Sequence, residues 1–262
     1  MSGAAWWRRA FGEGVYPLKS LAGSAAFRSR TRYELPLILR ALRLKPGSEL
    51  LDVCCGVGRH AVPLAGLGVR VTGLDWSPVY LAEAKRRARR ARVRADFVRG
   101  DMRRMPFRER FDAALNMWTS FGYFATAAED LAALRSVRRA LKPGGLFLVD
   151  TINGGRLAAL MAWQEALGLG NQRWSEMEDG TLVLEDPSLV SGGRVVRTRW
   201  LFLKGPRRRE METRVRLYTA RALSSLCARA GLEVLKVYGE MSGSAYSARH
   251  SRRVVVVARR PQ

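Results

Sequence analysis

Cysteine is scarce in this 262-residue chain, which has only Cys54, Cys55 and Cys227. The number is odd and no C-x-x-C spacing occurs, so the sequence argues against a disulfide framework and against a zinc site. Adjacent cysteines such as Cys54 and Cys55 could scarcely bridge to each other without strain. We therefore expect no metal, and a reduced, cytoplasmic protein.

Long apolar runs are also missing. The longest, such as 254–258, have the length of a strand, so no segment is predicted to span a bilayer. Residues 1–16 lack an apolar run of signal-peptide length. No low-complexity stretch and no internal repeat is present. The sequence therefore predicts a globular chain, either one large domain or a core with an insertion.

Acidic residues are few. The chain has 23 of them against 46 basic residues, 40 of which are arginine, and its formal net charge is +23. This charge is typical of a nucleic-acid partner. However, the arginines are spread along the whole chain, as a GC-rich genome would also produce. The densest cluster, 85–110, fits either the solvated face of a helix and its loops or a nucleic-acid contact surface.

Strands and helices are expected to alternate from Leu50 to Thr151. The strands are predicted at 49–53, 69–74, 94–98, 111–117 and 146–151, with helices at 59–67, from Ser77-Pro78 to about 91, and at 129–141. This alternation is typical of a parallel, doubly wound sheet. Residues 154–218 change character, with a helical stretch and strands at 181–185, 194–204 and 208–218. A helix at 219–230 and strands at 232–238 and 253–259 complete the chain.

A glycine-rich motif follows the first expected strand. Residues 56–61, GVGRHA, fit G-x-G-x-x-A, and Asp75 lies 19 residues beyond Gly56. Glycines let the backbone approach a ligand closely, and a carboxylate after the second strand accepts hydrogen bonds from ribose hydroxyls. Dinucleotide dehydrogenases and methyltransferases share this geometry, so the motif alone does not separate them.

Three further features favour a methyltransferase. Asp52, four residues before Gly56, could hold a cationic amino-acid ligand but would repel a pyrophosphate. Asp101 follows the third strand, where its carboxylate suits a ligand with an adenine amino group that can donate a hydrogen bond to it. Downstream of the fifth strand comes a terminal pair of strands and not a second mononucleotide-binding half.

The chain resembles the class I S-adenosylmethionine-dependent methyltransferases over roughly residues 30–262. The resemblance is carried by LLDVCCGVGRHA, VTGLDWSP, FVRGDMRRMPF, FDAALNMWTSFGYF, LKPGGLFLVDTIN and the C-terminal YTARALSSLCARAGLEVLKVYG. Within that family the chain is similar to bacterial glycine and amino-sugar N-methyltransferases. The resemblance implies a Rossmann-like seven-stranded sheet in one domain (1–262), an N-terminal lid (1–45) and a β-rich insertion (154–218) that covers the substrate.

The resemblance also implies S-adenosylmethionine as the cofactor and assigns residues to it. Asp52, Cys55, Gly56 and Gly58 would line its methionine part, Asp75 would hold the ribose, and Trp76, Asp101 and Met102 would contact the adenine. Asn116 and Trp118 would lie beside the sulfonium. Cys54 stands where the family usually has a glycine, so we expect this position to avoid positive φ.

Other candidates carry less specific signals. His60 is expected to pack near the cofactor and His250 to lie on the surface, with a base role for either as the alternative. Trp163, Trp174 and Trp200 are expected to pack within the insertion or to form a substrate wall. Tyr16 and Tyr33 are candidates for contact with cofactor or substrate, and Cys54 and Cys55 for packing rather than nucleophilic chemistry. No general base is evident, and no catalytic residue is assigned.

The predicted activity is methyl transfer to a nitrogen or oxygen atom of a small molecule. RNA is the alternative acceptor because of the net charge. The fourth strand ends in NMWT, which lacks the Asn/Asp-Pro-Pro-aromatic turn of enzymes that methylate base amino groups, and no cysteine follows it for a covalent route. A cofactor-binding regulator and a dehydrogenase are further alternatives. A homodimer is possible, and a membrane partner is not expected.

Overall fold

Seven strands form the central sheet of the computed structural model, which describes residues 6–12, 16–18 and 23–262. Across the sheet their order is β10 (Glu233–Tyr238), β11 (Arg253–Arg259), β5 (Leu141–Ile152), β4 (Phe111–Asn116), β1 (Glu49–Val53), β2 (Arg70–Asp75) and β3 (Ala95–Arg99). The strands from β5 to β3 run parallel, whereas β11 is antiparallel to both of its neighbours. The predicted Rossmann-like fold class is confirmed.

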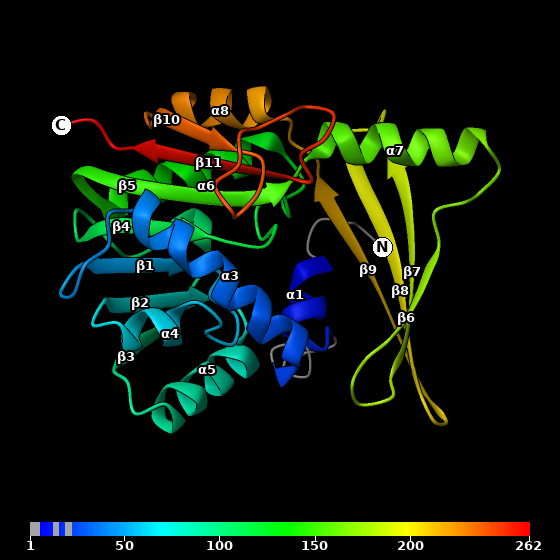
Figure 1. The fold of residues 1–262 in the computed structure, drawn as a ribbon, viewed down its shortest axis with the longest axis horizontal. Coiled ribbons are helices and arrows are strands. Elements are labelled where there is room, and N and C mark those ends of the chain that lie inside the picture. The colour runs from blue at the N-terminus through cyan, green and yellow to red at the C-terminus, as the bar shows by residue number, and fades with distance from the viewer. Residues whose placement is uncertain (1–5, 13–15, 19–22) are drawn as a thin grey trace.

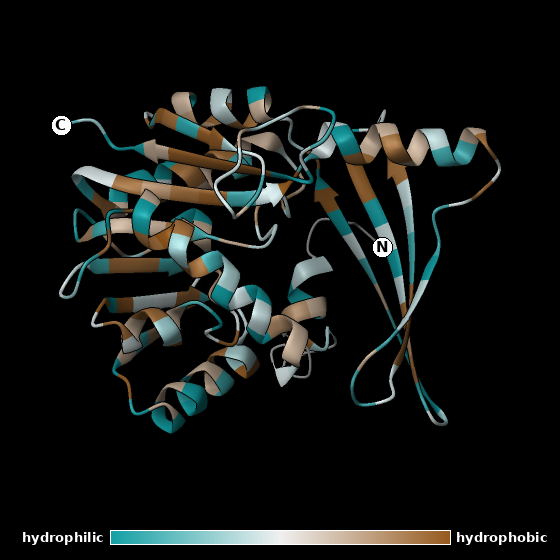
Figure 2. Ribbon diagram, in the orientation of Figure 1, coloured by the Kyte–Doolittle hydropathy of each residue, from teal (hydrophilic) through white to brown (hydrophobic). Residues whose placement is uncertain are grey.

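Helices cover both faces of this sheet (Figure 1). Leu50 and Leu51 point to opposite faces of the sheet, as successive strand residues do, and both are fully buried because both faces are covered. The face of Leu50 packs against α3 (Ala25–Ala41) and α4 (Ala61–Gly66), and the face of Leu51 packs against α6 (Ala127–Ala140) and α8 (Ala220–Arg229). Burial on both faces explains why inner strands such as β5 and β11 contain nearly continuous apolar runs, coloured brown in Figure 2.

Local signals in the sequence set several helix ends. Helix α5 (Pro78–Arg90) begins as predicted, because the Ser77 hydroxyl accepts a hydrogen bond from the Tyr80 amide and Pro78 occupies the first turn. Helix α6 begins with a capping box in which Thr126 and Glu129 each bind the other's backbone amide. A short 3-10 helix, η2 (Met102–Arg104), follows β3. These caps fix the loops that leave the carboxyl ends of the strands.

The segment after β5 forms a second sheet. Helix α7 (Gly154–Ala166) leads to four antiparallel strands, β6 (Arg173–Glu176), β7 (Leu182–Val190), β8 (Val195–Lys204) and β9 (Arg207–Arg216), in that order. The strands expected at 194–204 and 208–218 are β8 and β9, which form a hairpin with Lys204 paired to Arg207. Strand β6 was not predicted, and β7 runs through Pro187 to Val190. Figure 1 shows this sheet beside the carboxyl ends of the central strands.

The N-terminal residues divide between two places. Helix α1 (Trp6–Gly12) contacts β9 and lies between the two sheets, whereas α3 covers one face of the central sheet (Figure 1). Parts of the predicted lid, residues 1–5, 13–15 and 19–22, lie outside the described residues. Among those that are described, no helix is long and apolar enough to cross a membrane.

Candidate active site

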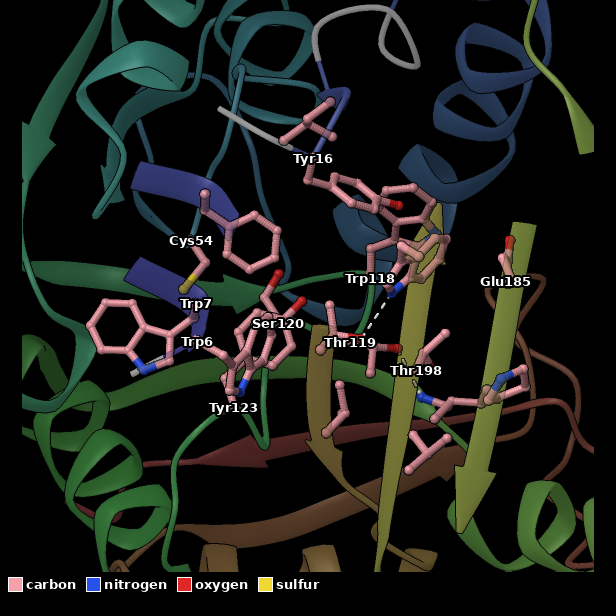
Figure 3. A pocket seen from close by; sticks show the side chains of 18 of the residues that line it. Trp6, Trp7, Tyr16, Cys54, Trp118, Thr119, Ser120, Tyr123, Glu185 and Thr198 are labelled. Atoms are coloured by element: carbon pink, nitrogen blue, oxygen red, sulfur yellow. Dashed lines mark hydrogen bonds between the residues drawn. The ribbon is translucent and has the colours of Figure 1, made fainter. Parts of the chain in front are cut away.

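A cavity of about 470 Å³ lies between the carboxyl ends of the central strands, the N-terminal residues and the inserted sheet (Figure 3). Its walls come from the loops after β1 to β5, from α1 and α7, and from one face of β7, β8 and β9. The central-sheet side includes Cys54, Gly56, Asp75, Trp76, Gly100, Asp101, Met102, Trp118, Thr119 and Ser120. In open α/β sheets, ligands bind at this edge of the strands.

The turn after β1 brings backbone to the cavity. Gly56 and Gly58 have φ of +54° and +74°, and Cys54 has φ of +60°. The expectation that Cys54 avoids positive φ is therefore wrong. The Cys55 amide donates a hydrogen bond to the Leu74 carbonyl of the neighbouring strand at 3.0 Å, and this bond fixes the turn. It holds Cys54 in the left-handed conformation, which costs a non-glycine residue about 1–2 kcal/mol. Burial raises the pKa of the Cys54 and Cys55 thiols well above their usual range, so neither is suited to act as a nucleophile.

Asp75, the last residue of β2, holds the same turn. Its two carboxylate oxygens accept hydrogen bonds from the backbone amides of Gly56 and Ser77, each at 2.8 Å. Burial raises the pKa of Asp75, and the backbone hydrogen bonds act in the opposite direction. The carboxylate is thereby fixed in the cavity wall, with lone pairs left over for a ligand.

Asp101 and Trp76 form the neighbouring part of the wall. Burial raises the pKa of Asp101, but hydrogen bonds from Arg103, including one of 2.6 Å to Oδ2, leave it below its ordinary value. The Trp76 ring has the guanidinium groups of Arg8 and Arg99 at 5.1 and 5.3 Å from its centroid. This corner of the cavity presents a flat aromatic ring beside an ionised carboxylate.

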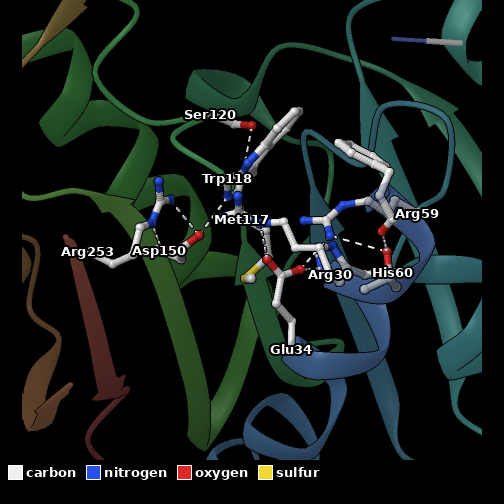
Figure 4. Close-up of polar contacts among 11 residues, drawn as sticks. Arg30, Glu34, Arg59, His60, Met117, Trp118, Ser120, Asp150 and Arg253 are labelled. Carbon is white, nitrogen blue, oxygen red and sulfur yellow. Dashed lines mark hydrogen bonds and ion pairs between the residues drawn. The ribbon is translucent and has the colours of Figure 1, made fainter. Parts of the chain in front are cut away.

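The loop after β4 has a strained turn at the cavity. Trp118 and Thr119 both have positive φ, +59° and +62°. The Trp118 amide donates to Oδ2 of Asp150 at 3.0 Å, and Arg253 binds both oxygens of Asp150 at 2.7 and 2.6 Å (Figure 4). The Ile152 amide also donates to the Thr119 hydroxyl. Strain of this kind persists where surrounding contacts over-determine the backbone.

Glu34 of α3 anchors the helix to the residues before α4. Its carboxylate binds Arg30, Arg59 and His60, with His60 Nε2 at 2.8 Å (Figure 4). Burial raises the pKa of Glu34, but hydrogen bonds from His60 and Arg59 outweigh it and bring the value to about 2. Burial lowers the pKa of His60 to about 4. His60 is thus neutral at pH 7 and donates to Glu34, which supports packing rather than a base role.

Comparison with known proteins identifies the domain. Residues 50–145 match the family model described as a methyltransferase domain. Residues 50–145 of this chain therefore form a methyltransferase domain. A methyltransferase of solved structure from Clostridium acetobutylicum shares the fold, with a TM-score of 0.74, 16% identity and coverage of 88% of this chain and 91% of that one.

Two curated relatives of this methyltransferase domain carry different names. A demethylmenaquinone methyltransferase of Renibacterium salmoninarum is 34% identical over 136 residues, 52% of this chain and 54% of the relative. A dTDP-3-amino-3,4,6-trideoxy-alpha-D-glucopyranose N,N-dimethyltransferase of Streptomyces venezuelae is 34% identical over 108 residues, 41% of this chain and 44% of the relative. The chain spans about half the length of these relatives, and the two names point to different acceptors.

Within the methyltransferase domain, the predicted cofactor residues fall into two groups. Gly56, Asp75, Trp76, Asp101, Met102 and Trp118 line the cavity, whereas Asp52, Cys55, Gly58 and Asn116 lie behind its wall. Two of the second group have buried oxygen atoms, Oδ2 of Asp52 and Oδ1 of Asn116, that lack a hydrogen-bond partner among the described residues. Burial raises the pKa of Asp52 to about 7, although the charge of Arg59 opposes this.

The remaining sequence candidates are separated by the tertiary structure. Tyr16 and Trp200 line the cavity. Tyr33, Trp163 and Trp174 are exposed at 52%, 58% and 58%, so the expected packing of these two tryptophans is wrong. His250 lies on the surface, as expected.

Sequence reasoning missed several cavity residues of the methyltransferase domain. Trp6 and Trp7 belong to the N-terminal helix, and Glu185 and Arg253 come from strands of two different sheets. For Glu185 the sequence signal existed only in part, because its strand was predicted to end at that residue. For Arg253 no local signal was available, since its partner Asp150 lies 103 residues earlier.

Proposed function

We propose that the protein is an S-adenosylmethionine-dependent methyltransferase that methylates a nitrogen or oxygen atom of a small molecule. One observation carries this proposal: a single cavity joins the carboxylates at the ends of β2 and β3 to the inner face of the inserted sheet. The first side suits a nucleoside, and the second side leaves room for an acceptor next to it. The methyltransferase-domain match at residues 50–145 supports the same reading.

The residues present fit the cofactor. Asp75 offers a fixed carboxylate to two ribose hydroxyls, and Asp101 beside Trp76 offers a carboxylate and a ring to an adenine. The carboxyl group of Asp52 lies buried behind the glycine turn with its Oδ2 unpartnered among the described residues, and a cationic methionine group bound at the turn would favour its ionised form. When bound, the cofactor supplies a methyl group that its sulfonium already activates.

The chain itself then has to align the acceptor and keep water away from it. Effective alignment alone can account for several kcal/mol of a barrier, about 7–11 in favourable cases. Trp6, Trp7, Trp118 and Tyr123 bring aromatic surface to the cavity (Figure 3). Burial raises the pKa of the Tyr16 phenol above its usual range, with the charge of Glu185 adding to the effect, so Tyr16 can donate a proton in a hydrogen bond but is not a base at pH 7.

The charge of the chain is the observation that favours RNA as a second candidate acceptor. However, only Arg173 and Arg253 are basic among the described residues that line the cavity, and Arg253 is already paired with Asp150. Recognition of a phosphate backbone depends on unpaired basic side chains. The lining thus supports a small molecule over RNA.

Methyl-labelled S-adenosylmethionine, incubated with the protein and a cell extract split into RNA, protein and small-molecule fractions, tests the proposal. We expect label in the small-molecule fraction. Asp75→Ala should weaken cofactor binding by more than about tenfold, because it removes charge-assisted hydrogen bonds. Asp96→Ala, at a residue whose side chain is 78% exposed and remote from the cavity, is the matched control. Nuclease-sensitive label in RNA would overturn the proposed acceptor class.

A further inference from the structure

The inner face of the inserted sheet presents an ordered set of side chains to the cavity. Strand register places Glu185 of β7 opposite Trp200 of β8, and places Pro187, Thr198 and Thr213 together in the next row on the same face. All five line the cavity. Since residues two apart on a strand share a face, the sheet has a polar and aromatic surface here rather than an apolar one.

Trp200 is held rigidly in this surface. Its Nε1 donates to the Thr213 hydroxyl at 3.0 Å, and its ring is stacked with that of Phe202 at a centroid distance of 6.2 Å. The Tyr16 ring meets it edge-on, with centroids 5.7 Å apart. An aromatic ring fixed on several sides is a prepared binding surface, because little side-chain entropy is lost when a ligand lies against it.

Glu185 adds a negative charge beside this ring. Among the described residues, Glu185 forms an ion pair with Arg173 at 3.3 Å, and the Arg173 side chain is 72% exposed. An exposed pair of this kind contributes little and can be exchanged for a ligand. Figure 3 shows Glu185 and Thr198 on neighbouring strands at the inserted-sheet side of the cavity.

The charge balance of the cavity is opposite to that of the protein. Three acidic residues, Asp75, Asp101 and Glu185, line it against two arginines. Asp101 is paired with Arg103 and Arg253 is paired with Asp150, and neither partner lines the cavity. The whole chain has twice as many basic as acidic residues, 46 against 23. An anion would be drawn to most of this surface, but not to this cavity.

We infer that Glu185 and Trp200 form an acceptor subsite that binds a small organic cation, an amine that is protonated at neutral pH. The carboxylate pairs with the ammonium group, and the indole face adds a cation–π contact. The subsite recognises the acceptor by its positive charge and does not itself specify which atom is methylated. Where the amine nitrogen is the acceptor, the ammonium first gives one proton to Glu185 or to water, because only the neutral amine has the lone pair that displaces the methyl group from the sulfonium. This inference rests on the proposed function.

The test uses three pools of small compounds that share carbon skeletons and differ in one group. The first holds amines such as 2-phenylethylamine and glucosamine, the second the corresponding alcohols, and the third the corresponding carboxylic acids. Transfer from methyl-labelled S-adenosylmethionine is measured for each pool, together with equilibrium binding of each pool and of the cofactor. We expect binding and label in the amine pool.

Glu185→Gln and Asp186→Asn make a matched pair of variants. Each removes one negative charge, but Asp186 is the next residue on β7, outside the cavity lining, and contacts Gln172 and Arg199 instead. Glu185→Gln should lower kcat/KM for the labelled amine at least about tenfold, mainly through KM, while cofactor Kd stays within about twofold. Asp186→Asn should leave both values within about twofold of the wild type.

The outcomes separate this inference from the proposed function. A wild-type protein that does not bind S-adenosylmethionine would overturn both. A protein that binds the cofactor but neither binds nor methylates any amine, or that prefers the alcohols or acids, would overturn the cation subsite alone. Equal behaviour of Glu185→Gln and Asp186→Asn, with both folded by thermal unfolding, would also overturn it.

Discussion

Replacing Asp52 with asparagine should make the protein more stable and its cofactor binding weaker. Asp52 is 2% exposed, its Oδ2 has no partner among the described residues, and burial raises its pKa from 3.8 to about 7. At about 1.4 kcal/mol per pKa unit, this shift corresponds to about 4 kcal/mol of destabilisation when the carboxyl must ionise. Asparagine has nearly the same shape and needs no ionisation.

The pH dependence follows from the direction of the shift. Between about pH 4 and pH 7 the folded protein keeps the Asp52 proton that the unfolded chain has released, so wild-type stability falls as pH rises through this window. The Asp52→Asn protein lacks this loss. The two free energies of unfolding should therefore agree near pH 4 and differ by up to about 4 kcal/mol from pH 7 upward, with the variant the more stable.

Urea unfolding at several pH values measures this difference in the cofactor-free protein. Titration calorimetry at pH 8 should show the opposite order for function, with S-adenosylmethionine bound at least about tenfold more weakly by Asp52→Asn, because the cation loses an anionic partner. Wild-type affinity should rise between pH 6 and pH 8 as Asp52 ionises. A variant less stable than the wild type at pH 8, or a constant difference at all pH values, would refute the reasoning.

Two further predictions concern the loops at the cavity. Arg253→Met should cost about 3–5 kcal/mol of stability in urea unfolding because it leaves the buried Asp150 unpaired. The double variant with Asp150→Asn should lose less, and equal losses would contradict a charge-pair origin. Cys54→Val should cost about 1–3 kcal/mol, since a β-branched residue fits poorly at φ of +60°. Cys54→Gly should stay within about 1 kcal/mol of the wild type, and equal effects of the two substitutions would exclude a left-handed turn.

The central sheet could be predicted because its signals are local. Apolar strand-length runs buried on both faces, and the Ser77-Pro78 helix start, need only neighbouring residues to be recognised. The same holds for Gly56 and Asp75, whose spacing follows from the strand–turn–helix unit. Strand β6 was missed because 173–176 is short and wholly exposed, so it carries no burial pattern. The continuation of β7 was missed because Pro187 normally argues against a strand.

The conformation at Cys54 illustrates why local rules fail at the cavity. A non-glycine residue avoids positive φ when only its own backbone is considered. Here the Cys55 and Gly56 amides donate hydrogen bonds to Leu74 and Asp75 of the neighbouring strand, and these bonds fix the turn. Similarly, Trp163 and Trp200 are both tryptophans of the inserted segment and cannot be told apart by residue type, but of the two only Trp200 lines the cavity.

The sequence by itself determined the methyltransferase domain: the order of strands and helices, the glycine turn and the carboxylates at 52, 75 and 101. These depend on residues close together in the chain. Only the tertiary structure decided the acceptor side, because it requires contacts between distant segments. The inserted sheet brings Trp200 against Tyr16, and β11 brings Arg253 to Asp150. Such contacts are selected by packing and charge burial in three dimensions, and no periodicity in the chain records them.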